Sequence, residues 1–336
     1  MKTTVILDEL NLSDVRPDPI AQRYAQLRRG EALQLLSNPE AQWCGRPFPT
    51  AECEPRSMFE CDGLSFHECR SSGSYFASPV PDQTSIDRLA RDGEASKLRR
   101  EYFSQKFSQK QRDAIHAPMI RWIGDSLDET GFSGELTVAV VGNDDTGLAQ
   151  AVMDQLPVKR LAVVQCVSGQ PVAGAEVYDL ERAPVGEFDL VVDAGSLERV
   201  SNPQVRIDGW WRLLAPGGFL AFTTNTASGL EYRLLGAQAP SFVALDRLTL
   251  YSVPALKEVL DDAGFVVREL STPGRLDVEL LENALSVYSG EGHQFWSYLL
   301  AFGSENMKAE LQTFLQRHQL SSFARVFAHK PEDNSK

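Results

Sequence analysis

Short apolar runs alternate with amphipathic stretches along the second half of the chain. Five runs rich in Val, Leu, Ala and Phe follow one another from residue 136 onward, separated by stretches that can form helices: LTVAVVG, RLAVVQCV, AEVYDL, FDLVVDAG and GGFLAFTT. Apolar strands that alternate with helices indicate a parallel sheet covered on both faces. We therefore predict an α/β fold. Two later runs, VVREL and SFARVFAHK, add strands, and we expect the last one at an edge of the sheet.

Helical periodicity precedes and follows these strands. Apolar residues recur at helical spacing in RYAQLRRGEALQLL, across residues 84–130, in VPALKEVLDDAGF, from Asp277 to Leu285 and in MKAELQTFLQRH. Residues 41–82 are rich in Cys, Gly, Ser and Pro, which is typical of a small module dominated by loops. We predict three parts: an N-terminal helix and module at 1–82, a helical cap at 83–130 and an α/β domain at 131–336.

The chain carries a strong negative charge. Its 336 residues include 46 acidic and 33 basic side chains, which gives a net charge of −13 at pH 7. Such a surface repels nucleic acids and anionic membranes, so we expect a small-molecule substrate. The first residues are acidic where a signal peptide is basic, and no apolar stretch reaches the length of a membrane span. We expect a cytoplasmic protein.

Four of the five cysteines lie close together near the N-terminus: Cys44, Cys53, Cys61 and Cys69. In a reducing compartment such a cluster indicates a metal site, or the remnant of one, before it indicates disulfides. A zinc ribbon needs two C-x-x-C knuckles, whereas Arg56 and Ser72 stand at the second cysteine positions here. Zinc requires four well-placed ligands. We therefore predict a degenerate ribbon without metal, with a zinc-loaded module as the alternative.

The loop after the first strand of the α/β domain is the first place to look for a ligand, because open parallel sheets bind ligands at the carboxyl ends of their strands. This loop reads Gly142-Asn143-Asp144-Asp145-Thr146-Gly147. Glycine allows the backbone to approach a nucleoside, and the following helix offers unpaired N–H groups. The two aspartates disfavour a pyrophosphate. The alternative is a helix N-cap that binds nothing.

At this point the chain resembles a known family. The segment FDLVVDAGSLERVSNPQVRIDGWWRLLAPGGFLAFTTNT is similar to the strand-four and strand-five signature of class I S-adenosylmethionine (SAM) methyltransferases. The segments DRLTLYSVPALKEVLDDAGF and STPGRLDVELLENAL resemble a bacterial subgroup found in carbohydrate and specialised-metabolite pathways, which also carries an N-terminal cysteine ribbon. The resemblance implies a Rossmann-like, seven-stranded methyltransferase sheet with SAM as cofactor.

The resemblance also implies where SAM lies. Its expected contacts are the first loop, the end of strand two and the mouth of strand four: Gly142, Asn143, Asp144, Asp145, Gly147, Gln165, Asp193 and Ser196. Several positions depart from the family pattern. Val140 stands where the first strand has an acid, and Gln165 stands where an acid binds the ribose. The paired histidines of the subgroup are Asp246 and Arg247, so a base matched to neutral pH is missing.

Methyl transfer needs a base only when the nucleophile must lose a proton. We predict Glu198, which follows strand four, as a base or substrate-orienting residue, with a helix N-terminal acid as the alternative. Asp246 and Tyr251 are predicted to contact substrate. The expected function is SAM-dependent methylation of a small polar metabolite or sugar, in a homodimer or beside a pathway enzyme. The alternatives are a scaffold or partner protein that has lost SAM, and SAM chemistry other than methylation, such as cyclisation.

Overall fold

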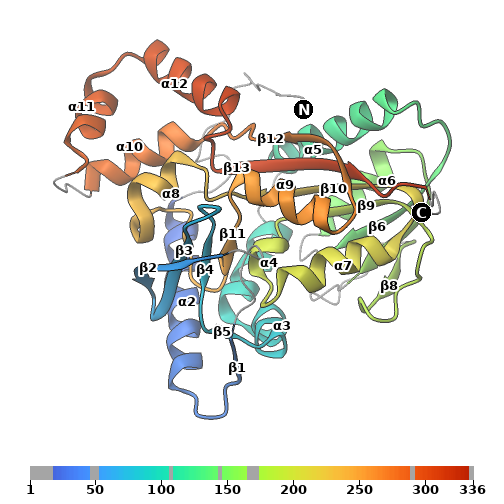
Figure 1. Cartoon of the computed structure of the whole chain (residues 1–336), viewed down its shortest axis with the longest axis horizontal. Helices are drawn as coiled ribbons and strands as arrows, with labels where there is room; N and C mark the ends of the chain where they lie inside the picture. Colours follow the sequence, from blue (N-terminus) through green and yellow to red (C-terminus); the bar gives the residue numbers. More distant parts are fainter. Residues whose placement is uncertain are drawn as a thin grey trace.

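The structure is a computed structural model that describes residues 18–45, 53–105, 109–142, 146–164, 174–287 and 292–332 (Figure 1). Its helices are α2 (Asp18–Ser37), α3 (Gln83–Asp92), α4 (Glu94–Gln105), α5 (Gln109–Glu129), α6 (Thr146–Gln155), α7 (Pro203–Leu213), α8 (Leu230–Leu235), α9 (Val253–Asp262), α10 (Asp277–Val287), α11 (Gln294–Phe302) and α12 (Glu305–Arg317), with 3₁₀ turns η1 (Leu197–Arg199) and η2 (Gly236–Gln238). Its strands are β1 (Trp43–Cys44), β2 (Pro55–Cys61), β3 (Leu64–Cys69), β4 (Tyr75–Ala77), β5 (Val80–Pro81), β6 (Leu136–Val141), β7 (Val158–Val164), β8 (Glu176–Tyr178), β9 (Phe188–Ala194), β10 (Leu214–Asn225), β11 (Thr249–Leu250), β12 (Val266–Ser271) and β13 (Phe323–His329).

A seven-stranded sheet forms the centre of the molecule. Its strand order is β12-β13-β10-β9-β6-β7-β8, and β13 runs antiparallel to both of its neighbours. The pairs from β10 to β8 are parallel. This confirms the predicted Rossmann-like α/β sheet. The expectation that the last strand lies at an edge is wrong: β13 inserts between β10 and β12, so it gains ladder hydrogen bonds on both sides and β12 becomes the edge.

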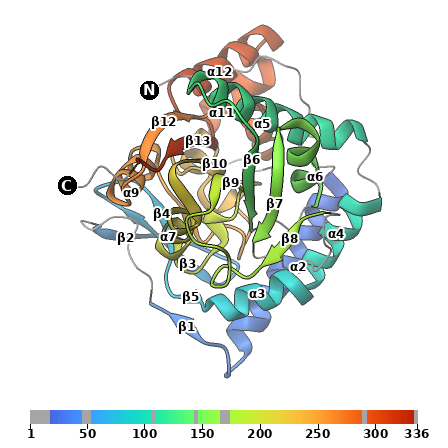
Figure 2. The same ribbon diagram turned by 90° about the vertical axis from the view of Figure 1, so that its right-hand side faces the viewer.

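Each face of the sheet is buried by its own helices, as Figure 2 shows. Alternate side chains of a strand point to opposite faces, so Val138 and Val140 of β6 pack with α5 and α6, while Ala139 and Val141 pack with α7 and α9. Trp210 of α7 is fully buried in the second of these cores. The helices therefore hold the sheet on both sides and leave the strand ends for a site.

The N-terminal module is built mainly from strands in its described part, so the expectation of a loop-dominated module is wrong. β2 and β3 form a hairpin around Asp62-Gly63, whose φ angles of 48° and 83° suit a tight two-residue turn. A strand from the α/β domain completes this sheet, because β11 pairs with β4. Phe66 and Leu64 pack in one core with residues of α8 and α10. The predicted division at residues 82 and 130 stays a prediction.

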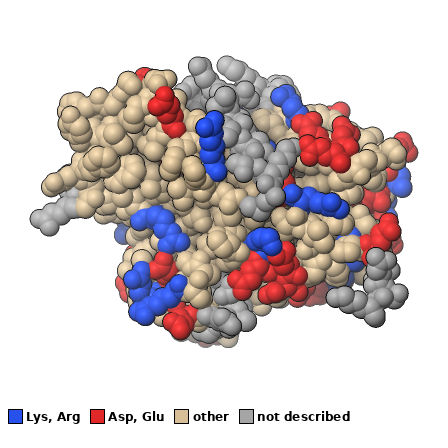
Figure 3. All heavy atoms as spheres, turned by 45° about the horizontal axis from the view of Figure 1, so that its top comes forward, with Lys and Arg blue, Asp and Glu red and all other residues tan. Residues whose placement is uncertain are grey.

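The C-terminal helices α10, α11 and α12 extend from one end of the molecule (Figure 1). Helix α11, which sequence reasoning did not identify, exposes a row of aromatic side chains: Phe295, Tyr298 and Phe302. Figure 3 shows a broad area with few charged side chains at this end. Among the described helices, none combines the length and the apolar character that crossing a bilayer requires.

Candidate functional site

A cavity of about 610 Å³ lies at the carboxyl ends of the parallel strands. The sheet contributes Gly142 after β6, Asp179 after β8 and Ser196 after β9. Helix α3 closes the opposite side and lies below the arrowheads of these strands in Figure 2. It lines the cavity with one face, because the lining residues recur every three or four positions: Gln83, Ile86, Asp87, Ala90 and Arg91. The cavity therefore occupies the place where α/β folds bind ligands.

Two side-chain contacts fix α3 over the cavity. The helix begins after Asp82, whose carboxylate accepts a hydrogen bond from the Ser85 backbone N–H at 3.2 Å. Gln83 Oε1 accepts hydrogen bonds from the backbone N–H and the hydroxyl of Ser201, at 3.0 and 3.1 Å. The loop beyond β9 thus holds the covering helix directly.

Gly142 lies in close contact with the loop that follows β9. Its φ angle is 65°, and a Cβ atom built there would lie 2.7 Å from Ser196 Cβ. The left-handed conformation and the short distance both require glycine. Two predicted site residues, Gly142 and Ser196, are therefore brought together at the wall of the cavity.

Asp193 holds the β9 loop in place from below. Its carboxylate accepts hydrogen bonds from the Ser196 backbone N–H at 3.1 Å, the Ser196 hydroxyl at 2.5 Å and Trp210 Nε1 at 3.0 Å. Burial raises the pKa of Asp193, although the charge of Arg206 and these hydrogen bonds act in the opposite direction. Asp193 is 1% exposed. It therefore positions Ser196 without facing the open cavity.

Arg206 of α7 lines the same cavity and was not predicted. It is 6% exposed, and its Nε and Nη1 have no hydrogen-bond partner within the described part of the chain. Burial lowers the pKa of its guanidinium, and the charges of Asp193 and Asp87 partly offset this effect. A sequence signal existed: Arg206 occupies the buried face of α7 together with Ile207, where an apolar residue is expected.

Glu198 lies behind the cavity in a closed network. It is 2% exposed and forms an ion pair with Arg247, whose Nη1 lies 2.8 Å from its Oε1. It also accepts hydrogen bonds from Thr224 Oγ1 at 2.8 Å, and from the backbone N–H and Nδ2 of Asn225 at 2.5 and 2.9 Å. Both oxygens of the carboxylate are therefore occupied, and the arrangement joins η1 to the end of β10.

The other two predicted catalytic residues are also buried. Asp246 accepts a hydrogen bond from the Tyr24 hydroxyl at 2.7 Å, and its Oδ1 lies 3.1 Å from Arg28 Nε. Burial raises the pKa of Asp246, but the charges of Arg28, Arg199 and Arg247 and the hydrogen bond from Tyr24 together outweigh it, so the net shift is downward. Tyr251 is 5% exposed in the core beside α9, and its carbonyl accepts hydrogen bonds from Ala227 and Thr226. Among the described residues that line the 610 Å³ cavity, Glu198, Asp246 and Tyr251 do not occur.

A second cavity of about 300 Å³ lies at the end of β10. Met119 and Trp122 of α5 and Phe323 of β13 form apolar walls, and Thr223 and Asn225 contribute polar atoms. Asn225 belongs to both regions, because it donates to Glu198 and lines this cavity. Gly195 N–H, next to Ser196, donates to the Thr223 carbonyl at 2.9 Å. The two cavities therefore lie at the ends of the neighbouring strands β9 and β10.

The remaining predicted cofactor contacts divide into two groups. Gly147 is described in the first turn of α6, directly behind the loop. Asn143, Asp144, Asp145 and Gln165 lie outside the described residues. The proposed contacts of these four residues stay predictions.

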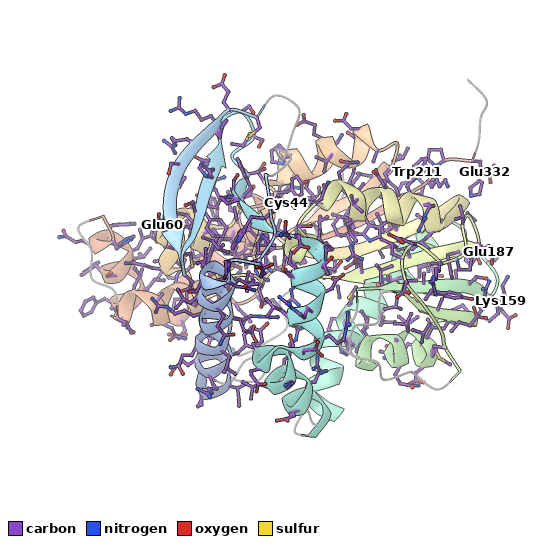
Figure 4. The ribbon with its side chains drawn as sticks, turned by 90° about the horizontal axis from the view of Figure 1, so that it is seen from below. Cys44, Glu60, Lys159, Glu187, Trp211 and Glu332 are labelled. Carbon is purple, nitrogen blue, oxygen red and sulfur yellow. The ribbon has the colours of Figure 1, made fainter. Side chains whose placement is uncertain are left out.

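The cysteines do not come together as one metal site in the described structure. Cys69 lies at the open end of the β2–β3 hairpin, opposite Pro55, whereas Cys61 lies at the turn. In Figure 4, Cys44 lies apart from Glu60, the neighbour of Cys61. Among the described residues, no group of three or more His, Cys, Asp or Glu side chains has the geometry to hold a metal ion. The expectation that this module holds no zinc stays a prediction.

Comparison with known proteins identifies part of the chain. Residues 124–270 match the family model of a methyltransferase domain. No curated protein matches the chain. Among solved structures, it is similar to Haemonchus contortus phosphoethanolamine N-methyltransferase 2 in complex with S-adenosyl-L-methionine, at 16% identity and a TM-score of 0.45, over 77% of this chain and 63% of that one.

Two further solved structures show the same kind of likeness. A SAM-dependent methyltransferase from Mesorhizobium loti has 15% identity and a TM-score of 0.38, over 62% of this chain and 97% of that one. The [4+2]-cyclase SpnF has 19% identity and a TM-score of 0.40, over 63% of this chain and 81% of that one. At these values, the substrates and reactions of the three proteins are not carried over to this chain.

Proposed function

Starting from the methyltransferase domain at residues 124–270, we propose that the protein binds SAM in the 610 Å³ cavity and transfers its methyl group to a small polar metabolite or a sugar. The observation that carries this proposal is the position of the cavity at the carboxyl ends of β6, β8 and β9, with Gly142 and Ser196 in contact at its wall. In α/β folds this place binds nucleosides.

The residues around the cavity fit the cofactor. A side chain at position 142 would clash with Ser196, so glycine allows the loops after β6 and β9 to pack together at the wall of the cavity. Arg206 offers N–H groups without a partner in the described structure, which suits an anionic group. The proposed contacts are Gly142, Ser196 and Gly147, with Asn143, Asp144, Asp145 and Gln165 completing the loop side. Asp193 would act indirectly, through the hydroxyl and backbone N–H of Ser196.

SAM, when bound, supplies an electrophilic methyl group on its sulfonium. The contribution of the chain is then positioning and the exclusion of water. Helix α3 would cover the cavity and keep water out. Glu198 would hold Asn225 at the end of β10, since two N–H groups of Asn225 donate to its carboxylate. We propose Glu198 and Asp246 as positioning residues, because ion pairs already occupy both carboxylates.

The second cavity suits the acceptor. It lies at the end of β10, where Asn225 meets the Glu198 network, and the first cavity lies at the end of the neighbouring strand β9. Its volume of about 300 Å³ suits one ring-sized molecule. The apolar surface of Trp122 on one side and the amide of Asn225 on the other would accommodate a molecule with an apolar and a polar side, such as a sugar ring.

Titration calorimetry with SAM and S-adenosylhomocysteine tests the proposal. We expect a dissociation constant below about 1 mM, the upper end of ordinary KM values, and 1:1 stoichiometry. Failure of both ligands to bind would favour the alternative of a scaffold protein, which the ion-paired state of Glu198 and Asp246 also supports. Binding followed by S-adenosylhomocysteine release with a panel of sugars would identify the methyl acceptor. Binding with release of no such product would favour other SAM chemistry.

A further inference from the structure

Arg206 is a buried cation with two nitrogens that no described residue pairs. It is 6% exposed, and neither Nε nor Nη1 has a hydrogen-bond partner in the described structure. Native proteins pair nearly all buried polar groups, because an unpaired one loses its hydration without compensation. An unpaired guanidinium at the wall of a cavity therefore indicates a ligand that completes it.

The two described acids near Arg206 accept hydrogen bonds from other residues. Asp193 and Asp87 act on Arg206 through their charges, but neither forms an ion pair with it in the part of the chain that is described. Asp193 accepts three hydrogen bonds from Ser196 and Trp210. Asp87 accepts a hydrogen bond from Gln83 Nε2 at 2.8 Å, on α3. The guanidinium thus lies near negative charge that holds it in place, while its N–H groups stay available.

The position of Arg206 relative to the cavity identifies the part of the ligand that it meets. Its Nη1 lies 3.6 Å from the point that a Cβ atom of Gly142 would occupy. The guanidinium therefore lies next to Gly142, at the part of the cavity wall where the proposed cofactor passes. A guanidinium matches a carboxylate through two parallel N–H···O bonds, and the match is stronger away from water.

We propose that Arg206 binds the α-carboxylate of the amino-acid part of the cofactor and so makes the cavity selective for adenosyl ligands that carry this carboxylate. The inference rests on the proposed function, because it takes the ligand of this cavity to be SAM or its product. Arg206 acts in binding and takes no part in the transfer of the methyl group. Arg199, which lines the same cavity, also has a buried Nε without a hydrogen-bond partner in the described structure, but its side chain is less buried than that of Arg206. Arg182 is exposed to solvent and shares its charge with water.

Two ligands and three variants test this inference by calorimetry. S-adenosylhomocysteine is compared with its decarboxylated analogue, which keeps the adenosine, the thioether and the amine. We expect the unchanged protein to bind S-adenosylhomocysteine at least tenfold more tightly, since a charge-assisted bidentate pair is worth about one to two factors of ten. In Arg206→Met this preference should vanish, with little change for the analogue. Arg206→Lys keeps the positive charge but lacks the two parallel N–H donors of a guanidinium. It should therefore retain part of the preference for S-adenosylhomocysteine.

The Arg88→Met variant is the matched control, because Arg88 is an exposed arginine on α3 that lies outside the described lining of the cavity. We expect its preference between the two ligands to stay within about threefold of the unchanged protein, as expected for an exposed and screened charge. Thermal unfolding of each variant checks that it is folded. Arg206→Lys serves for the comparison if Arg206→Met does not fold.

Three results would overturn the inference. Equal affinity of the unchanged protein for both ligands would show that no group recognises the carboxylate, and this result needs no variant. Equal losses for both ligands in Arg206→Met would show that Arg206 only supports the fold. If the unchanged protein binds neither ligand, the proposed function itself fails, and the inference that rests on it fails as well. The first two results leave SAM binding intact and are thereby distinguished from the third.

Discussion

Arg247 Nη1 lies 2.8 Å from Glu198 Oε1 in an ion pair that is almost completely buried. The residue before Arg247 forms a second pair, since Asp246 Oδ1 lies 3.1 Å from Arg28 Nε. In the methyltransferase subgroup that the sequence resembles, these two positions are histidines. Here they carry fixed charges that join the loop after η2 to η1 and to α2. Two buried ion pairs therefore stand at the positions where the resemblance implies groups that titrate near neutral pH.

The first prediction concerns Glu198→Gln. The change leaves the Arg247 guanidinium without its charge partner in a buried place, and breaking a buried pair typically costs about 3–5 kcal/mol. We expect the free energy of unfolding in urea to fall by roughly this amount. Any loss of turnover should follow the loss of folded protein, with SAM affinity of the folded fraction preserved. Glu258→Gln, which changes an exposed acid on α9, is the control and should stay within about 0.5 kcal/mol of the parent.

A different result for Glu198→Gln would support the role of Glu198 as a base. If Glu198→Gln keeps its stability and its SAM affinity but loses turnover, the carboxylate takes part in the reaction. The ion pair would then have to open when the acceptor binds. If the variant is folded but no longer binds SAM, Glu198 supports the cofactor side of the site.

Sequence reasoning found the sheet because its signal is local. Each parallel strand is a continuous apolar run, and the strands at β6, β7, β9 and β10 lie where the runs predicted them. The order of strands is a matter of pairing between distant segments, which explains why β13 was wrongly expected at an edge. The same reason applies to β11, a strand of only two residues that becomes regular by pairing with β4.

The site was predicted in part for a similar reason. Gly142 and Ser196 follow β6 and β9, and Asp193 lies near the end of β9, so the topology alone brings them to one end of the sheet. The roles expected for Glu198 and Asp246 depended on whether their carboxylates face solvent, and their partners Arg247 and Arg28 come from distant segments. Arg206 was missed because a single cation on an apolar helix face looks like an ordinary boundary residue until its burial is known.

A second prediction compares two glycines with the same backbone conformation. Gly142 and Gly131 have φ angles of 65° and 76°, but a Cβ atom would meet Ser196 at position 142 and nothing within 4 Å at position 131. Alanine at either position should cost about 1–2 kcal/mol of unfolding free energy from the left-handed conformation. We expect only Gly142→Ala to weaken SAM binding, by about tenfold or more, and Gly142→Val to weaken it further. Equal SAM affinity in folded Gly142→Ala and Gly131→Ala would argue against the proposed placement of the cofactor.

A third prediction uses the lowered pKa of Asp246. A carboxylate whose pKa is lower in the folded state stabilises the fold above its unfolded pKa of about 3.9, and this contribution is lost as the pH falls below that value. Asp246→Asn should therefore be less stable than the parent at pH 7, by roughly 1.5–3 kcal/mol, because it removes a charged contact with Arg28 while Arg28 keeps its ion pair with Glu31. The difference should narrow between about pH 4 and pH 2.

Urea unfolding at a series of pH values measures this difference. Asp208→Asn is the control, because Asp208 is exposed on α7 and faces only Gln204 in the described structure. We expect its stability to follow that of the parent at every pH. A constant difference between Asp246→Asn and the parent from pH 7 to pH 2 would contradict the assignment, since it would show that Asp246 does not titrate with unfolding.

The last prediction is that protein purified without chelator contains no stoichiometric zinc. Zinc binds thiolates, so a cysteine with a raised pKa is a poor ligand. Burial and the adjacent charge of Asp62 raise the pKa of Cys61 to about 12. Cys69 differs: burial raises its pKa, but hydrogen bonds from Cys53, Ser71 and Ser72 outweigh this effect and lower it to about 7. One good thiolate beside Cys53 supplies two ligands at most, whereas a structural zinc site needs four.

Elemental analysis should therefore find well under one zinc per chain, both before and after incubation with zinc followed by desalting. A content of about one zinc per chain that disappears in Cys53→Ser or Cys69→Ser would show that the module is a functional ribbon. Cys44→Ser, at an exposed thiol on another strand, is the control that should leave the zinc content unchanged.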